Sequence, residues 1–397
     1  MKKVALGLVV LTVLGFGVFK LRTKPVAITI ARPNTIVQTS VKTGADQPEA
    51  QIVRLIATGD FIAHDAINAA AKNLGGSYDY VSMMARMKPI FDKADLRFCN
   101  QATPAGGVGL GISGFPVFNA PLEWTRDMAN LGCNVVNIGS NHSNDKGQRV
   151  IDATRAGWDV RSGVLAVAGA NRSSDEQKNI GYFSTKGLKF AFLSYVTYSN
   201  TKDMTSYGVN MFSRTTAADQ LKEARSKADI ILVSMRWGTE YSPSINSEQA
   251  TDGQFLADNG ADIVFGHGPH VVEPVKVLTG QGGRSTWVWY SLGNFLNAQL
   301  EPEALFSGLP FIDIDAASKQ IKNVRYLPIY MHYLWTPAQA AAQDLLARRD
   351  FELYTLDDAA APLAASQLKT TVEAQRTRIE STLNTYTKVP IMSSKDL

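Results

Sequence analysis

Short apolar runs alternate with amphipathic segments from residue 53 onward. The run from Val53 to Thr58 predicts a buried strand, and a helical pattern follows at about 81–92. Further strands are predicted at 95–99, 134–138 and 164–168, and helices at 121–131 and 148–159. Strands that alternate with helices are typical of a parallel sheet covered by helices, so this half of the chain predicts an α/β arrangement.

The later part of the chain adds hairpins to this alternation. The segment from Tyr182 to Leu193 predicts a hairpin that turns at Lys186-Gly187. Helices are predicted at 215–226 and 247–259, and strands at 229–235, 262–266, 273–279, 286–292, 310–315 and 321–330. We therefore expect an α/β fold over residues 51–335, a sandwich of two mixed β-sheets flanked by helices. Residues 336–397 are Ala-rich and polar, which predicts a helical C-terminal extension with a loose tail.

The first 50 residues have a different character. Lys2 and Lys3 precede an uncharged run at 4–19, and three further basic residues follow it by residue 24. A positive start before a short apolar core is typical of an export signal. No small-residue cleavage pattern follows, so residues 1–24 predict a transmembrane signal anchor, with a cleaved signal as the alternative. Residues 25–50, with three prolines among polar residues, predict a linker.

The anchor also predicts where the protein is located. No later apolar run is long enough to span a membrane again, so we expect a single-pass protein of the cell membrane with its main domain extracytoplasmic. The formal net charge is +4, without a basic run, so nucleic acid is not an expected partner.

The chain has two cysteines, Cys99 and Cys133. Cys99 would end one predicted strand, while Cys133 would begin another, at opposite edges of a parallel sheet. A disulfide requires Cα atoms about 5.5 Å apart. We therefore expect two buried free thiols.

Polar residues that suit a metal site follow several predicted strands. Asp60 follows the first strand, Asn141 and His142 follow the strand at 134–138, and His267 and His270 follow the strand at 262–266. Carboxylate and amide oxygens with imidazole nitrogens suit a divalent ion, which generates hydroxide and binds phosphoryl oxygens. The pattern predicts a divalent metal at these five residues, and Mn, Fe, Zn and Mg all remain candidates.

Other polar residues are predicted to line the same cleft. Arg236, Glu240 and Tyr241 follow the strand at 229–235, and Asn294 follows the strand at 286–292. His64 lies four residues after Asp60, close enough to support a ligand or to replace one. The substrate-binding candidates are therefore Arg236, Glu240, Tyr241, His64 and Asn294. The catalytic candidates are His142, Asp60 and Arg236.

Two strings in these segments are specific enough to indicate a family. The G-H-x-P-H-V string at 266–271 and the Y-S-L-G-N-F string at 290–295 resemble motifs of the CapA family. That family is linked to the synthesis of poly-γ-glutamate capsules and is built on the calcineurin-like metallophosphatase fold. The resemblance runs from about residue 53 to residue 330. It implies a metallophosphatase-like sandwich, a role in capsule or cell-envelope polymer synthesis, and a capsule-synthesis complex as partner.

The chain departs from this family at two positions. Ala102 stands where the family motif N-x-E has its carboxylate, and Arg236 stands where the motif H-W-G has its histidine. A guanidinium does not coordinate metals, and a fixed cation beside a missing anion weakens the binding of a dication. We therefore expect one ion or none rather than two. Arg236 is expected to replace the second ion as a clamp for phosphate or carboxylate, and decay of a redundant paralogue is an equal alternative.

Two functions from different classes fit the sequence. In the first, the protein is a phosphoesterase-like hydrolase with one metal ion, which acts on a phosphoester or on a bond of an acidic polymer. In the second, it is a non-catalytic binding or scaffold protein whose cleft holds an anionic cell-envelope polymer through Arg236. The resemblance to a family does not by itself separate the two.

Overall fold

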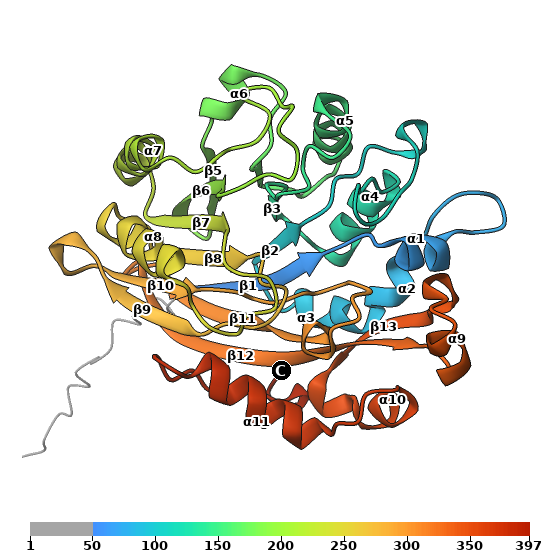
Figure 1. Ribbon diagram of the computed structural model, residues 1–397. Coiled ribbons are helices and arrows are strands. Elements are labelled where there is room, and N and C mark those ends of the chain that lie inside the picture. The colour runs from blue at the N-terminus through green and yellow to red at the C-terminus, as the bar shows by residue number, and fades with distance from the viewer. Residues whose placement is uncertain (1–50) are drawn as a thin grey trace, which may run out of the picture. The chain divides into compact units, whose positions relative to one another are not determined.

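Two mixed β-sheets lie face to face, with helices on their outer sides (Figure 1). The structure is a computed structural model that describes residues 51–397. The predicted anchor at 1–24 and linker at 25–50 lie outside the described residues. In residues 51–397, no helix is both long and apolar enough to cross a membrane.

The first sheet has seven strands in the order β13-β12-β11-β1-β2-β3-β4. Neighbours from β1 to β4 are parallel, whereas β11, β12 and β13 join the sheet as antiparallel strands. The bounds are β1 (Ile52–Phe61), β2 (Leu96–Gln101), β3 (Val135–Asn137), β4 (Ala166–Ala168), β11 (Phe306–Asp315), β12 (Gln320–Leu334) and β13 (Arg349–Thr355).

The second sheet has six strands in the order β5-β6-β7-β8-β10-β9. Its four central strands are parallel, and the edge strands β5 and β9 are antiparallel to their neighbours. The bounds are β5 (Gly181–Thr185), β6 (Leu188–Val196), β7 (Ile230–Arg236), β8 (Ile263–His267), β9 (Val275–Thr279) and β10 (Ser285–Trp289).

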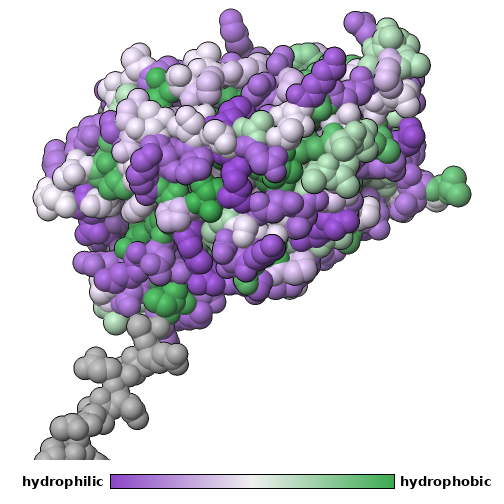
Figure 2. Space-filling model, turned by 90° about the horizontal axis from the view of Figure 1, so that it is seen from below, coloured by the Kyte–Doolittle hydropathy of each residue, from purple (hydrophilic) through white to green (hydrophobic). Residues whose placement is uncertain are grey.

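Helices cover the outer faces of both sheets. Helices α7 and α8 pack on the six-stranded sheet, and α10 packs on β12 of the other sheet (Figure 1). Figure 2 shows the molecule from below, where apolar side chains occur in small groups between hydrophilic ones. The bounds are α1 (Asp65–Ala71), α2 (Val81–Met84), α3 (Lys88–Phe91), α4 (Glu123–Leu131), α5 (Gln148–Asp159), α6 (Ser174–Lys178), α7 (Arg214–Lys227), α8 (Ser247–Asp258), α9 (Pro337–Ala341), α10 (Ala360–Ala365) and α11 (Val372–Leu383).

The predicted alternation of strands and helices is confirmed, and so is the sandwich of two mixed sheets. Each strand predicted between 53 and 330 is present, with bounds shifted by a few residues. The helical pattern at 81–92 is divided into α2 and α3 by a short 3₁₀ turn. The hairpin predicted at Lys186-Gly187 joins β5 to β6.

The C-terminal residues differ from the expected helices and loose tail. Residues 349–355 form the strand β13, which pairs with β12 at the edge of the seven-stranded sheet. Near the end of the chain, Ile391 forms a bridge to Tyr326 of β12. The strand was missed because its alternation of buried residues, Phe351 and Leu353, is short and lies among charged residues.

The prediction of free thiols is wrong, because Cys99 and Cys133 form a disulfide. Cys133 was predicted to begin a strand, but β3 begins only at Val135. Cys133 lies in the connection from α4, where its N–H donates to the carbonyl of Met128. This connection brings the Cα atom of Cys133 to 5.7 Å from that of Cys99 in β2. The position of Cys133 is therefore set by this connection and not by the register of the parallel strands.

We expect the disulfide to contribute substantially to stability. The cysteines are 34 residues apart, and the loop-entropy model gives roughly 4 kcal/mol for a loop of this length. Changing both cysteines to alanine should lower the free energy of unfolding by about this amount in urea titrations. Wild-type protein unfolded in reductant, which keeps both sulfur atoms, separates loss of the crosslink from loss of packing. Two reactive thiols in unfolded, unreduced protein would contradict the assignment.

Candidate functional site

Asp60 lies at the carboxyl end of β1, where the parallel strands β2 and β3 also end. The register places Asp60 opposite Asn100, and Asn100 opposite Asn137. Asn100 donates to Asp60 over 2.6 Å, and Asn137 donates to Asn100 over 2.6 Å. The hydroxyl of Ser194, in β6 of the other sheet, donates to Asn137. These four buried side chains form one hydrogen-bonded chain that orients Asp60 and links the two sheets.

Two glycines bring the end of β1 against the loop that follows β10. A Cβ atom on Gly59 would lie 2.1 Å from the carbonyl oxygen of Gly293, so only glycine allows this approach. The N–H of Asp60 donates to Gly293 over 3.0 Å, and the N–H of Phe295 donates to the carbonyl of Asp60 over 2.8 Å. Asn294 therefore lies beside Asp60, although it comes from the other sheet.

Two imidazoles face the carboxylate of Asp60. Nδ1 of His270 lies 2.9 Å from Oδ2 of Asp60, and Nδ1 of His267 lies 3.5 Å from Oδ1. Burial alone would raise the pKa of Asp60, but His267 and His270 together hold it well below its ordinary value. Asp60 is therefore an anion despite its 1% exposure.

His267 is buried without a hydrogen-bond partner for either ring nitrogen. Its ring stacks on Phe98 of β2, with 5.5 Å between the ring centres. Burial lowers its pKa more than the neighbouring Asp60 raises it, so the imidazole is neutral, the form that binds metals. A buried polar group without a partner carries a large desolvation cost, which is typical of a position prepared for a ligand.

The backbone beside the site adopts a conformation that costs energy. His270 and Tyr241 have φ angles of 64° and 59°, in the left-handed region that residues other than glycine rarely occupy. The N–H of Tyr241 donates to the carbonyl of Pro269, next to His270, over 2.8 Å. Such strain persists only where surrounding contacts fix it, and it is concentrated at functional sites.

His142 forms a pair with Asp145. Nδ1 of His142 lies 2.7 Å from Oδ2 of Asp145, and this carboxylate also accepts the N–H of Phe118. Nδ2 of Asn200 lies 3.3 Å from Nε2 of His142. A carboxylate at Nδ1 fixes the orientation of an imidazole and leaves Nε2 to exchange a proton.

Arg236 ends β7 and is held by acceptors from three segments. Its Nε donates to Oδ1 of Asn141 over 2.8 Å, Nη1 donates to the carbonyl of Trp237 over 3.2 Å, and Nη2 donates to the hydroxyl of Tyr198 over 2.6 Å. The guanidinium also lies over the ring of Tyr198, 4.8 Å from its centre. A Cβ atom at Gly268 would lie 1.8 Å from Nη1, so a glycine at this position makes room for the arginine.

Most of the predicted site residues line one cavity of about 70 Å³. Its apolar wall contains Ile62, Ala102 and Phe118, which pack together as a small separate cluster. The remaining lining residues are Asp60, His64, Thr103, Phe115, Asn141, His142, Arg236, Glu240, Tyr241, His270 and Gln299. His267 and Asn294 do not line the cavity but lie behind it, against Asp60 and His270.

His64 is oriented by the loop after β10. Its Nδ1 accepts the N–H of Ala298 over 3.1 Å, and its ring meets Phe118 edge to face. Burial lowers the pKa of His64 to about 3, so it is neutral at physiological pH. His332, by contrast, is buried away from the cleft beside the hydroxyl of Tyr330, 3.2 Å away.

Sequence reasoning did not assign several residues that contact the site. Asp145 lies three positions after His142, and this spacing allows the two side chains to pair. A local sequence pattern could therefore have identified Asp145. Tyr198 and Asn200 lie in the long connection after β6, and Gln299 lies after β10 and donates to Tyr241 over 3.2 Å. These three contact residues distant in the sequence, and no local pattern marks them.

Only part of this arrangement fits a metal ion. Within residues 51–397, no three His, Cys, Asp or Glu side chains are arranged to hold an ion. The carbonyl oxygen of Asn141 already accepts from Arg236, and Nδ1 of His142 is already paired with Asp145. The unpartnered nitrogens of His267 beside the anionic Asp60 are the feature that fits an ion. The five predicted ligands therefore do not converge on one point.

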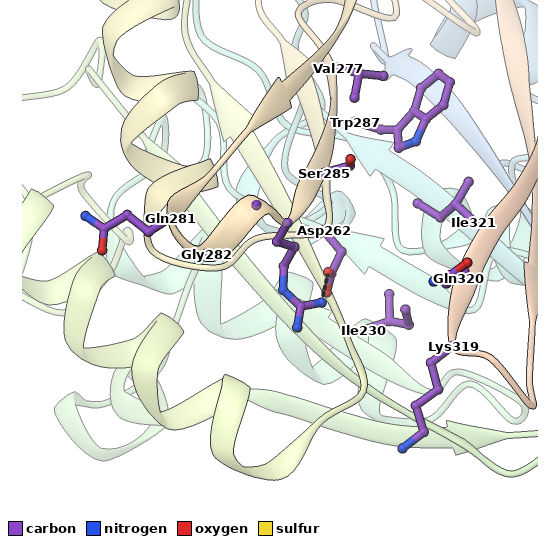
Figure 3. A pocket seen from close by; sticks show the side chains of 12 residues that line it. Ile230, Asp262, Val277, Gln281, Gly282, Ser285, Trp287, Lys319, Gln320 and Ile321 are labelled. Atoms are coloured by element: carbon purple, nitrogen blue, oxygen red, sulfur yellow. Dashed lines mark hydrogen bonds and ion pairs between the residues drawn. The ribbon is translucent and has the colours of Figure 1, made fainter.

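A larger cavity, of about 750 Å³, lies at the amino end of the parallel strands of the six-stranded sheet (Figure 3). Trp287 of β10 and Ile321 of β12 contribute apolar walls. Its buried carboxylate, Asp262, is neutralised by Arg225 and Arg284, and Lys319 is paired with Asp229. Ligands of α/β sheets bind at the carboxyl ends of strands, so the smaller cleft is the better candidate.

Comparisons with known proteins agree with the motifs at this cleft. A model of the family described as bacterial capsule synthesis protein PGA_cap matches residues 54–299. The chain is 32% identical over 178 residues to the PGA biosynthesis protein CapA of Bacillus subtilis (strain 168), covering 44% of this chain and 45% of that protein. It is 26% identical over 185 residues to the capsule biosynthesis protein CapA of Bacillus anthracis, covering 45% and 43%. The matched part spans less than half the length of these relatives.

Among solved structures, the chain resembles a crystal structure described as a novel phosphatase from Mycoplasma pneumoniae. The TM-score is 0.47 and the sequence identity 12%, over 71% of this chain and 95% of that one.

One buried carboxyl behind the cleft is not used by the site. Glu273 is fully buried, accepts from Nε2 of Gln249 over 2.6 Å, and has no partner for its second oxygen. Burial raises its pKa to about 8 from the ordinary 4.5, because one hydrogen bond does not replace the lost water.

We expect Glu273 to make stability depend on pH. Between pH 4.5 and pH 8 the unfolded chain loses this proton while the folded protein keeps it, so stability falls as pH rises, by roughly 1.4 kcal/mol per pH unit at most. Glu273→Gln removes this titration. Urea unfolding at pH 5 and pH 8 measures this effect. The free energy of unfolding of the variant, relative to that of the wild type, should be higher at pH 8 than at pH 5. A difference that is the same at both pH values would contradict the raised pKa.

Proposed function

Because the chain belongs to the family of bacterial capsule synthesis proteins described as PGA_cap, we propose that it acts in the synthesis of an anionic capsule or cell-envelope polymer, such as poly-γ-glutamate. The cleft at the carboxyl ends of β1, β3, β7 and β8 is its working site. The proposed activity is hydrolysis of a phosphoester or of a bond in the polymer, in a metallophosphatase-like fold that holds a single divalent ion.

The observation that carries this proposal is the unsatisfied His267 beside Asp60. Asp60, His267 and His270 are the side chains that would hold the ion, although in the structure they are not arranged around one common point. A bound ion would supply a hydroxide nucleophile and polarise the reacting bond. Asn100 and Asn294 support this set, because each hydrogen-bonds to one of its members.

His142 and Asp145 provide the proton chemistry. Asp145 holds the imidazole through Nδ1, and a doubly protonated His142 would give the proton on Nε2 to the leaving group at the cavity wall. The apolar cluster of Ile62, Ala102 and Phe118 excludes water from this side of the cavity.

Arg236 takes the place of a second ion. Its guanidinium is a fixed positive charge at Asn141, and Ala102 contributes no carboxylate that a second dication would require. Arg236 binds the phosphate or carboxylate oxygens of the substrate, as guanidinium groups do in a forked geometry.

A second candidate function is non-catalytic binding of an anionic polymer. It is favoured by the absence, within residues 51–397, of three side chains arranged to hold a metal. In that case Arg236 and the histidines that line the cavity hold the polymer for another member of a capsule-synthesis complex.

We further propose that the domain works outside the cytoplasm, attached to the membrane by residues 1–24. The disulfide between Cys99 and Cys133 supports this location, because disulfides persist mainly in oxidising compartments. External protease added to intact cells would degrade an exported domain, and a fully protected domain would refute the location.

Metal stoichiometry separates the two functions. Calorimetric titration of the purified protein with Mn²⁺ should give one ion per chain. His267→Asn removes a proposed direct ligand, so it should weaken binding by more than the roughly 10-fold to 100-fold that is typical of losing an outer-shell partner. His332→Asn, which changes a buried histidine outside the cleft, is the matched control and should bind like the wild type. Two ions would refute the proposed role of Arg236, and no binding would favour the polymer-binding function.

Restoring the second ion should require two changes together. Ala102→Glu alone supplies an anion that pairs with Arg236, and Arg236→His alone supplies an imidazole without the anion. The double variant Ala102→Glu/Arg236→His should gain about one ion per chain in Mn²⁺ titrations, by more than the sum of the single changes. If the single variants account additively for the double variant, Arg236 does not replace an ion.

A further inference from the structure

The guanidinium of Arg236 is largely engaged by the protein itself. Asn141, Trp237 and Tyr198 accept three of its five N–H groups. One N–H remains on Nη1 and one on Nη2. These two N–H groups are the part of the guanidinium fork that remains for a phosphate or carboxylate ligand.

The carboxylate of Glu240 already lies near Nη2, which carries one of these two N–H groups. Its Oε1 lies 3.4 Å from Nη2 of Arg236, and it is the carboxylate that pairs with this arginine in residues 51–397. Both residues line the cavity, whereas Tyr198 does not. The carboxylate of Glu240 therefore approaches the guanidinium from the side on which a ligand would enter.

The contact with Glu240 is weaker than the others. The three acceptors that hold Arg236 lie at 2.6–3.2 Å and include buried groups, while Glu240 lies at 3.4 Å with its side chain 48% exposed. Long and solvated ion pairs contribute little to stability. Arg236, at 3% exposure, stays in place when this pair opens, because its other three contacts remain.

We propose that the carboxylate of Glu240 competes with acidic ligands for Arg236. Its carboxylate occupies the anion position in the free protein, and a ligand oxyanion displaces it toward solvent. This inference rests on the proposed function of Arg236 as the anion clamp. Since the ligand must replace an existing carboxylate, a phosphate dianion is favoured over a single carboxylate at this position.

The test is the affinity for inorganic phosphate and for glutarate, measured by calorimetry without added metal. Glu240→Gln keeps the size of the side chain and removes the competing charge, so it should bind phosphate about 5-fold to 10-fold more tightly than the wild type. Glutarate should gain by a similar factor but remain the weaker ligand. Glu248→Gln makes the same change of net charge at an exposed residue of α8 and is the matched control.

Arg236→Gln separates the inference from the function on which it rests. If Arg236→Gln abolishes binding but Glu240→Gln binds no better than Glu248→Gln, Glu240 does not compete and only this inference fails. If neither anion binds in a manner that depends on Arg236, the proposed anion clamp fails as well. Tighter binding of glutarate than of phosphate by the wild type would overturn the predicted preference for the dianion.

Discussion

The architecture of the cleft depends on one buried carboxylate, that of Asp60. An anion removed from water needs hydrogen bonds or positive groups around it, or it would take up a proton. Asn100 supplies a hydrogen bond from the neighbouring strand, while His267 and His270 lie opposite and come from the second sheet. The two sheets must therefore lie close together at the carboxyl ends of their parallel strands. The cleft forms where they meet, so the constraint that stabilises the anion also creates the site.

The hydrophobic core below the cleft also holds the two sheets together. Phe98 of β2 stacks on Phe265 and meets Phe192 edge to face, so one side chain of the first sheet packs on two strands of the second. The same ring supports His267. Above this apolar contact, the hydrogen bond from Ser194 to Asn137 adds a directional link between the sheets. Apolar packing brings the sheets together, and the polar chain determines their alignment at the level of Asp60.

Much of the fold and part of the site could be predicted from the sequence. Strand and helix periods are local, so β1 to β12 were found, and glycines before polar residues marked the strand ends around Asp60 and His267. Contacts between distant segments were not predictable in this way. The pairing of Cys99 with Cys133 depends on the path of a connection across a sheet, and Tyr198 reaches Arg236 from a connection without a regular pattern. Sequence motifs indicated the candidate ligands, but the hydrogen bond that Arg236 donates to Asn141 is seen only in the structure.

Arg236 also changes what the site needs in order to work. A metal ion dissociates and must be supplied, whereas a guanidinium held by Asn141, Trp237 and Tyr198 is a permanent part of the protein. The positive charge that attracts an acidic ligand is then independent of metal supply. In the proposed function, hydrolysis would still require an ion at Asp60, because imidazoles and a guanidinium do not generate hydroxide at neutral pH. In the proposed function, binding at Arg236 and hydrolysis at Asp60 are therefore separable steps.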